Sequence, residues 1–426
     1  MLCLFGLAAP SQAKLIAIEE RGSLAGAYFF PDRTPDLIEA FLFIKSGGFY
    51  GDGPDGLAHY LEHLVWLSAV NPDGLATAAR DDGAKVNGWL TTYFLKGKPE
   101  ELSAYLETLA KVFEPPSLDE AFMREEVEII KREYDYRILE DSLYPVSRDI
   151  ETRLFGDEGR GRSTIGTPES IAALTPELAM ALHARTHVPA NAVLFVMGNA
   201  DRKTVLPLVE KHFGSIASGN APEPFQTSPL REGREIVETS VEGLTSDRLV
   251  YTKRIKLEAP IARDLLRRRL LLLYAIWDST LEGSLAKPLR FDDFIASEFS
   301  VGFDVLAPDE VLMIFNAVPD EGIDLFKLLT AFEETIEAIA EDGIPEATFE
   351  RIRKKRLDFL DHSKGRRWLA LDLVRHQTID HAEPIDSETY IERLGETTRD
   401  EMNELVRALA GPGHVAAALV SPKASE

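Results

Sequence analysis

The sequence has almost no cysteine. Cys3 is the single one among 426 residues, so no disulfide can form within the chain. Positive charge is also scarce, since 47 Lys and Arg face 71 Asp and Glu and leave a net charge of −24. That balance argues against nucleic acid and anionic membranes as partners. Long apolar runs are missing as well, because the longest, 270–277, is far too short to span a bilayer. We therefore expect a globular protein that binds neither nucleic acid nor membrane.

The first 13 residues are apolar and end in small residues near Ala13. This is typical of the second part of a secretory leader, although a basic segment before it is missing. We expect residues 1–13 to be a signal-peptide remnant and the protein to be exported to the periplasm. A cytoplasmic protein with an apolar N-terminal tail is the alternative.

Residues 59–63 read His-Tyr-Leu-Glu-His within a strongly helical run. Two histidines four residues apart share one face of a helix, and this spacing suits a single zinc ion. Glu62 lies between them and can hold and deprotonate a metal-bound water. The order H-x-x-E-H is the inverzincin signature of metalloproteases. A chance match or a buried structural histidine pair is the alternative, but burying two histidines and a glutamate unpaired would be costly.

A third zinc ligand is expected, because catalytic zinc sites use three protein ligands and keep a fourth position open. The best candidates lie in a second predicted helix, for which Ser117 and Glu120 suggest a capping box. Glu126 and Glu133 are seven residues apart there and share a face. Such a charge pattern is equally typical of a solvated helix, so periodicity alone does not choose between the two interpretations.

Together these motifs resemble the pitrilysin/insulinase family of zinc metallopeptidases, which includes the mitochondrial processing peptidases. Further similarity lies in Gly83–Gly88, Thr91–Tyr93 and Val193–Asp201. The resemblance implies one Zn²⁺ per chain and an extended peptide docked on the edge strand that carries Asn87. The site residues it implies are His59, His63 and Glu133 as zinc ligands, Glu62 as the catalytic base and Glu126 as the acid that supports the ligands.

The order strand, helix, strand, helix, helix occurs twice in the chain, so a large unit is duplicated. Strands mixed with helix pairs at these spacings predict an α+β fold made of two homologous α/β-layer domains. The segment 218–226 is rich in Gly and Pro and is the best linker. We therefore predict a zinc-binding catalytic domain at 14–217 and a homologous domain without zinc at 227–426.

The second copy has no H-x-x-E-H motif and carries Arg263 and Arg267 at the corresponding place. In larger relatives the half without zinc supplies an arginine and, seven residues later, a tyrosine that hold substrate. Arg290 fits the arginine, but Ser297 stands where the tyrosine would be. The resemblance also implies a clamshell of four domains, of which this chain supplies half. We therefore expect a heterodimer with a homologous zinc-less subunit, with a homodimer as the runner-up.

The function predicted from these observations is a zinc-dependent endopeptidase that hydrolyses short unstructured peptides by Glu-assisted attack of a zinc-bound water. Two alternatives stay open: a non-catalytic scaffold subunit of a peptidase-like complex, and a dedicated processing protease with one substrate. His183 and His187 are also four residues apart, but no acid lies between them. We interpret that second pair as structural.

Overall fold

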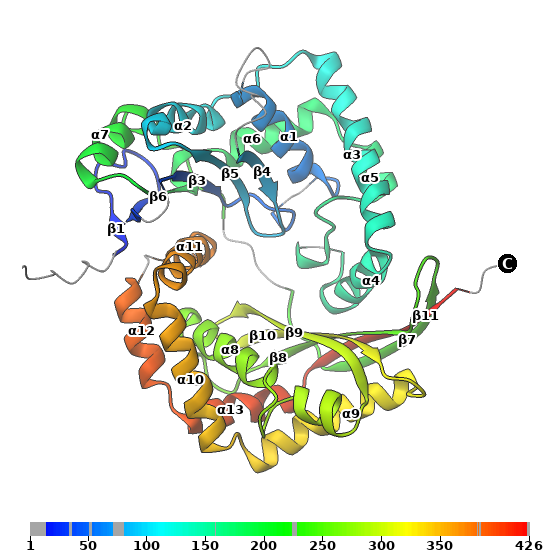
Figure 1. Ribbon diagram of the computed structural model, residues 1–426. Coiled ribbons are helices and arrows are strands. Elements are labelled where there is room, and N and C mark those ends of the chain that lie inside the picture. The colour runs from blue at the N-terminus through cyan, green and yellow to red at the C-terminus, as the bar shows by residue number, and fades with distance from the viewer. Residues whose placement is uncertain are drawn as a thin grey trace, which may run out of the picture.

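The computed structural model has two halves, each built on one β-sheet with helices on its faces (Figure 1). The predicted leader, 1–13, and residues 224–226 of the predicted linker lie outside the described residues. The structure describes residues 14–33, 36–50, 53–70, 81–157, 159–223, 228–380, 382 and 385–423. Among these residues, no helix is both long and apolar enough to cross a membrane.

The first half contains a six-stranded sheet in the order β1-β2-β6-β3-β5-β4. Its strands are β1 (Ile16–Ala17), β2 (Gly26–Pro31), β3 (Ile38–Ile44), β4 (Asp81–Val86), β5 (Thr91–Gly97) and β6 (Ala192–Gly198). Only β2 and β6 run parallel, and the other neighbours are antiparallel. All of β6 is buried, as its unbroken apolar sequence requires of a strand covered on both faces. At the opposite edge, β4 pairs with β5 and with no other strand that the structure describes.

The described residues of the first half also form seven α-helices. They are α1 (Leu57–Val70), α2 (Leu102–Ala110), α3 (Glu120–Glu140), α4 (Tyr144–Phe155), α5 (Pro168–Ala172), α6 (Pro176–Thr186) and α7 (Arg202–Phe213). The expected capping box of α3 is wrong. Asp119 is the N-cap, because its carboxylate accepts a hydrogen bond from the Ala121 N–H at 2.8 Å. The Ser117 N–H instead donates to Ser68 Oγ on α1 at 2.9 Å.

The second half contains a five-stranded sheet in the order β7-β11-β8-β10-β9. Its strands are β7 (Gly233–Val241), β8 (Arg248–Lys256), β9 (Ala296–Ala307), β10 (Glu310–Pro319) and β11 (His414–Pro422). Its helices are α8 (Arg263–Trp277), α9 (Leu325–Asp342), α10 (Glu346–Asp361), α11 (Ser363–Asp380), α12 (Ser387–Glu396) and α13 (Arg399–Ala410). A π-helical turn, Lys287–Asp292, leads into β9.

The two sheets repeat one topology strand for strand. The order β2-β6-β3-β5-β4 of the first corresponds to β7-β11-β8-β10-β9 of the second, and in both the first pair alone is parallel. A helix follows β3 and β8 in each copy, and a helix pair follows β5 and β10. The predicted α+β fold with a duplicated domain is therefore confirmed.

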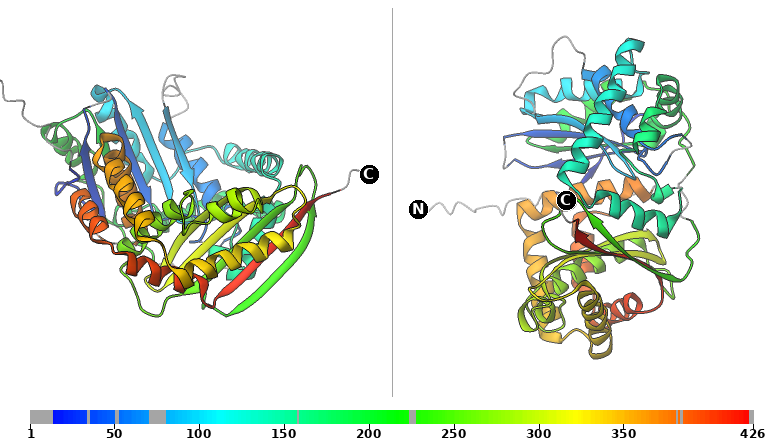
Figure 2. Two further views of the ribbon diagram at one scale, coloured as in Figure 1. Left: turned by 60° about the horizontal axis from the view of Figure 1, so that its bottom comes forward. Right: turned by 90° about the vertical axis from the view of Figure 1, so that its right-hand side faces the viewer.

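Each half also lends one helix to the other. Ala370 and Val374 of α11 pack against Phe30 and Phe195 of the first sheet. In return, α4 packs on the second sheet, where Ile150 joins a cluster of buried apolar side chains from β8, β10 and β11. Figures 1 and 2 show both helices lying between the two sheets. The two sheets are thus consecutive along the sequence, but two of the buried clusters contain side chains from both halves.

A buried charged group reinforces the position of α4. Arg254 on β8 is almost fully buried and donates two hydrogen bonds to Glu310 Oε1 on β10, at 2.8 and 2.6 Å. The same guanidinium donates to the Leu154 carbonyl near the end of α4, at 2.8 Å. One side chain of the second sheet therefore holds a helix of the first half.

Candidate metal centre and active site

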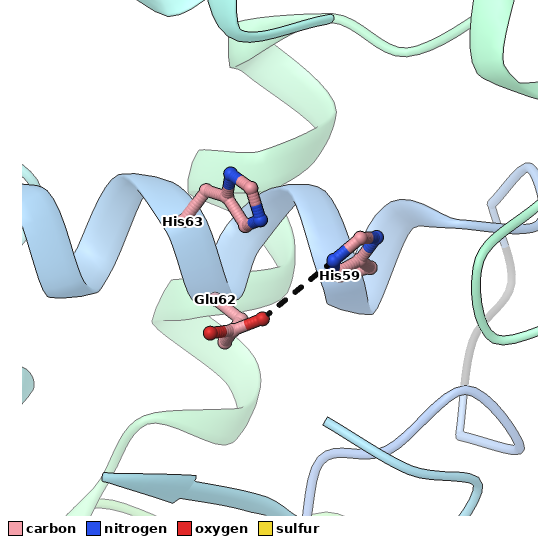
Figure 3. Close-up of side chains that lie close together, drawn as sticks. All are labelled: His59, Glu62 and His63. Carbon is pink, nitrogen blue, oxygen red and sulfur yellow. Dashed lines mark ion pairs between the residues drawn. The ribbon is translucent and has the colours of Figure 1, made fainter. Parts of the chain in front are cut away.

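Helix α1 carries the H-x-x-E-H motif, and the side chains of His59, Glu62 and His63 lie close together on it (Figure 3). Leu57, Leu61 and Leu64 are buried in the core, as the apolar stripe predicts. The helix start is anchored by Asp55, whose carboxylate accepts hydrogen bonds from the Ser163 N–H at 2.7 Å and Arg162 Nε at 2.9 Å. The motif therefore sits on a rigid element held at its beginning and along its inner face.

Glu133 of α3 completes a group of three converging donor atoms. Its Oε2 lies 3.3 Å from His59 Nε2 and 3.6 Å from His63 Nε2. Ligand atoms bound to one zinc at 2.0–2.2 Å in a tetrahedron stand roughly 3.3–3.6 Å apart. The separations therefore have the size that a single zinc ion requires. Glu62 also lies in this group, within 4.8 Å of the histidine ligand atoms, but its Oε2 is 3.9 Å from His59 Nε2. Glu133 is closer to both histidines and is therefore the better third ligand.

Glu126 orients one of the two histidines. Its buried carboxylate oxygen lies 3.2 Å from His63 Nδ1. A hydrogen bond donated by Nδ1–H leaves Nε2 of the same ring free to bind a metal, as is usual when a carboxylate backs a histidine ligand. His59 Nδ1 is buried and has no hydrogen-bond partner among the described residues. Its Nε2 is the nitrogen that faces Glu133.

The pKa shifts of the clustered carboxylates and histidines show that the site favours an added positive charge. Burial raises the pKa of Glu62, and the neighbouring His63 and His59 oppose this only in part. Hydrogen bonds from His59 and His63 hold the pKa of Glu133 well below its usual range. Burial would lower the pKa of His63, but Glu133, Glu62 and Glu126 outweigh it and raise that pKa to about 9. Three carboxylates around two imidazoles thus favour a cation, either protons or a metal.

The donor set fits Zn²⁺. Two imidazole nitrogens and one carboxylate oxygen form the combination found in catalytic zinc sites of the His₂Glu type, which leave a fourth position open. Glu62 stands beside this set without being needed in it, as a general base must. The sequence-predicted ligands His59, His63 and Glu133, with Glu62 and Glu126, are thus brought together at one place.

A pocket of about 330 Å³ opens next to His59. It lies between the end of the β4–β5 hairpin, α3 and α4. Its lining residues are Phe49, His59, Val86, Asn87, Gly88, Arg137, Tyr144, Arg148, Glu151, Thr164 and Ile165. The lining residues from α3 and α4 were not predicted from the sequence. The only signal for Arg137 is its spacing of four residues from Glu133, which places both on one face of α3.

The two predicted substrate contacts lie in different places. Asn87 lines the pocket, but its Oδ1 accepts hydrogen bonds from the N–H groups of Trp89 and Leu90, both at 2.8 Å, and so shapes the β4–β5 turn. Arg290 is exposed in the π-helical turn of the second half, with its guanidinium over the Phe291 ring, and is not among the pocket residues. Both substrate roles stay predictions.

The second histidine pair belongs to the core. The Tyr93 hydroxyl lies 2.9 Å from His187 Nε2, and His183 Nε2 lies 3.1 Å from the Val112 carbonyl. Burial lowers the pKa of both rings, most strongly that of His187. These contacts agree with the structural role predicted for the pair.

Comparison with known proteins identifies the family. Residues 33–167 match the model of insulinase (peptidase family M16), and residues 173–356 match that of the peptidase M16 inactive domain. The chain belongs to the M16 (insulinase) peptidase family. All of the clustered residues from His59 to Glu133 fall within the first match. The second match, 173–356, begins within the first half and includes the first part of the half that has no zinc motif.

Individual M16 relatives cover most of the chain. An uncharacterized zinc protease of Mycobacterium leprae is 25% identical over 395 residues, which are 87% of this chain and 83% of that protein. The crystal structure of a protease from Helicobacter pylori superposes with a TM-score of 0.79 at 18% identity, covering 96% and 100% of the two chains. The periplasmic protease PqqL from Escherichia coli superposes with a TM-score of 0.76 at 16% identity. That match covers 98% of this chain and 48% of PqqL.

Proposed function

We propose that this M16 protein is a zinc-dependent endopeptidase that binds one Zn²⁺ per chain and hydrolyses short unstructured peptides. The observation that carries the proposal is the convergence of His59 Nε2, His63 Nε2 and Glu133 Oε2 at separations that suit one tetrahedral zinc. A bound zinc ion supplies Lewis-acid chemistry, in that it polarises a carbonyl and makes water more acidic.

The chain's own groups have distinct roles in this proposal. Glu62, whose pKa burial raises, takes the proton of the attacking water and passes it to the leaving amine. Glu126 keeps the His63 ring in the orientation that turns Nε2 toward the ligands. The β4 strand is at the edge of its sheet and ends at the pocket, so an extended peptide can add to it as a further strand. Strand addition reads the backbone and suits substrates of varied sequence.

The proposal includes a second subunit. The chain matches only 48% of PqqL, so two such chains would equal one large relative in extent. Helix α8 of the second half, which corresponds to α1, carries no H-x-x-E-H motif. Aligning the burial patterns of α1 and α8 puts Arg267 at the place of His59 and Leu271 at that of His63. With Ser297 in place of the expected tyrosine, a heterodimer with a homologous zinc-less subunit is favoured over a homodimer.

An exported, periplasmic protein is also part of the proposal. Its support is the apolar segment 1–13, and PqqL of Escherichia coli is described as a periplasmic protease. Fractionation of the native organism with an antibody to the chain tests this address. Recovery in the cytoplasmic fraction alone contradicts it.

Hydrolysis of a quenched fluorescent peptide by the zinc-loaded chain tests the activity. Glu62→Gln is expected to reduce the rate by at least about 100-fold, the usual contribution of a general base, while zinc stays bound. Glu128→Gln removes an exposed carboxylate of α3 and is expected to leave the rate unchanged. Cleavage by the chain alone supports a homodimer, whereas cleavage only after adding a zinc-less homologue supports the heterodimer.

A scaffold subunit and a dedicated processing protease are the competing functions. Zinc-loaded chain that cleaves nothing, with or without a partner, would support the scaffold. Cleavage restricted to one sequence in a peptide mixture would support the processing protease. The position of Glu62 beside the candidate ligands favours an active enzyme over a non-catalytic scaffold subunit.

A further inference from the structure

Arg137 is an uncommitted cation beside the candidate metal centre. It is exposed on α3, and its guanidinium makes no hydrogen bond or ion pair with any residue that the structure describes. The acids four residues away on the helix are its ordinary partners. Glu133 is turned toward His59 and His63, however, and the Asp141 carboxylate accepts from the Leu143 N–H at 3.1 Å. Arg137 is therefore available to a ligand.

The rest of the pocket does not neutralise this charge. Arg148 pairs with Glu151 and donates to the Gly161 carbonyl, so those two charged residues offset each other. Phe49 contributes an aromatic wall, and Thr164 and Tyr144 contribute hydroxyl groups. Arg137 thus leaves one unpaired positive charge among the residues that line the pocket.

The pocket also lies where a substrate residue would be held. His59 is both a candidate zinc ligand and part of the pocket lining, and Val86 at the end of the edge strand β4 is another lining residue. Four helical residues separate Arg137 from Glu133, a rise of about 6 Å along α3. A side chain next to the bond undergoing hydrolysis would therefore enter between the metal ligands and Arg137.

We propose that Arg137 selects substrates that place a carboxylate in this pocket, next to the scissile bond. The carboxylate comes either from an Asp or Glu side chain or from the free C-terminus of a short peptide. An arginine fork binds a carboxylate through two charge-assisted hydrogen bonds, which is why a carboxylate is preferred over an amide of the same shape. The inference rests on the proposed peptidase function.

Matched peptides test this preference. One set differs only in Glu, Gln or Lys at the residues that flank the cleavage site, and a second carries the same Gln peptide with a free or an amidated C-terminus. Wild-type protein is expected to show a kcat/KM about five- to tenfold higher for a carboxylate than for its amide counterpart, as an exposed ionic hydrogen bond allows. The preference should shrink in high salt, because the guanidinium is exposed. The set that shows the preference identifies the source of the carboxylate.

Three substitutions of Arg137 and one control substitution separate this role from a structural one. Arg137→Ala should bring the carboxylate-to-amide ratio of kcat/KM near one, because the carboxylate peptide loses more than the amide peptide. Arg137→Lys should keep part of the preference, and Arg137→Glu should shift it toward Lys peptides. Lys131→Glu makes the same change of charge on another face of α3 and should alter nothing. An unchanged ratio in Arg137→Ala, with both peptides still cleaved, overturns the inference and leaves the peptidase function standing.

A binding measurement decides the matter even when turnover is absent. Fluorescence anisotropy with the zinc-loaded Glu62→Gln variant, with its partner subunit where one is needed, reports peptide affinity without hydrolysis. Tighter binding of the carboxylate peptide that is lost on adding Arg137→Ala supports the inference. Equal binding of the carboxylate and amide peptides overturns it, whatever the rate measurements give.

Discussion

The contact between Glu126 and His63 decides which nitrogen of that ring faces the metal ligands. Glu126→Ala removes the acceptor, so the ring loses its fixed orientation. We expect zinc affinity to fall about 10- to 100-fold, as is typical when a carboxylate behind a histidine ligand is lost. Competition with a chromogenic chelator measures this. Glu125→Ala alters the exposed neighbour on α3 and should bind zinc like the wild type. Equal affinities of the Glu126→Ala variant and the wild type would contradict this account.

His187 makes stability depend on pH. Burial holds its pKa well below the ordinary value, so the folded protein resists a proton that the unfolded chain accepts. Above pH of about 6.5 the ring is neutral in both states and has no effect. Below that pH the free energy of unfolding should fall by up to about 1.4 kcal/mol per pH unit until the folded ring titrates.

Urea denaturation between pH 7 and pH 5 measures the effect. His187→Gln removes the titrating group and keeps an amide oxygen that can accept from the Tyr93 hydroxyl. The variant should lose less stability than the wild type over this range, even if it is less stable at pH 7. Parallel curves for the two proteins would show that His187 does not carry the dependence.

At the scale of elements, the Arg254–Glu310 pair links α4 to the second sheet. Glu310→Ala leaves a buried guanidinium without its counter-charge, so we expect the free energy of unfolding to fall by about 3–5 kcal/mol. The adjacent surface pair between Lys256 and Asp309 provides a matched control, because an exposed pair contributes at most about 1 kcal/mol. Urea denaturation of Glu310→Ala and Asp309→Ala compares the two. A similarly small decrease in the free energy of unfolding in both variants would show that the buried Arg254–Glu310 pair does not stabilise the contact between α4 and the second sheet.

The sequence predicted the elements better than it predicted their neighbours. The apolar stripe of Leu57, Leu61 and Leu64 fixes both the existence of α1 and the face that bears the histidines. The seven-residue spacing of Glu126 and Glu133 was ambiguous until the resemblance gave it meaning, because a charged helix face reads the same with or without a metal. The cap is Asp119 and not Ser117, because two cap-forming residues separated by Leu118 precede α3 and the sequence alone does not choose between them.

Contacts between distant segments carried no local signal. Ala370 and Val374 of α11 pack against the first sheet. The periodicity of α11 predicts a buried face but does not indicate which sheet covers it. Arg137 likewise looks like any exposed helical arginine until α4 and the β4–β5 turn close a pocket around it. Such features depend on tertiary packing, which propensity and spacing do not encode.

At the scale of the whole molecule, the exchange of α4 and α11 couples the halves. Each sheet has a face covered by a helix from the other half, so neither half keeps an intact core alone. We expect one cooperative unfolding transition, with tryptophan fluorescence and far-ultraviolet circular dichroism giving the same midpoint. Trp66 reports on the first half and Trp277 on the second, and single-tryptophan variants can separate them. Two transitions with different midpoints would show that the halves unfold independently.

The exchange of α4 and α11 also affects how the chain folds while it is being synthesised. The first sheet is complete once β6 ends at Gly198, but α11 begins only at Ser363, about 165 residues later. At typical synthesis rates, roughly 10–30 s pass between completion of the first sheet and synthesis of α11, the helix that covers it. During that interval Phe30, Phe43 and Phe195, which are buried in the finished protein, have no partner from the second half. A chaperone that shields this aromatic face should therefore raise the yield of native protein, and its absence should favour aggregation of the unfinished chain.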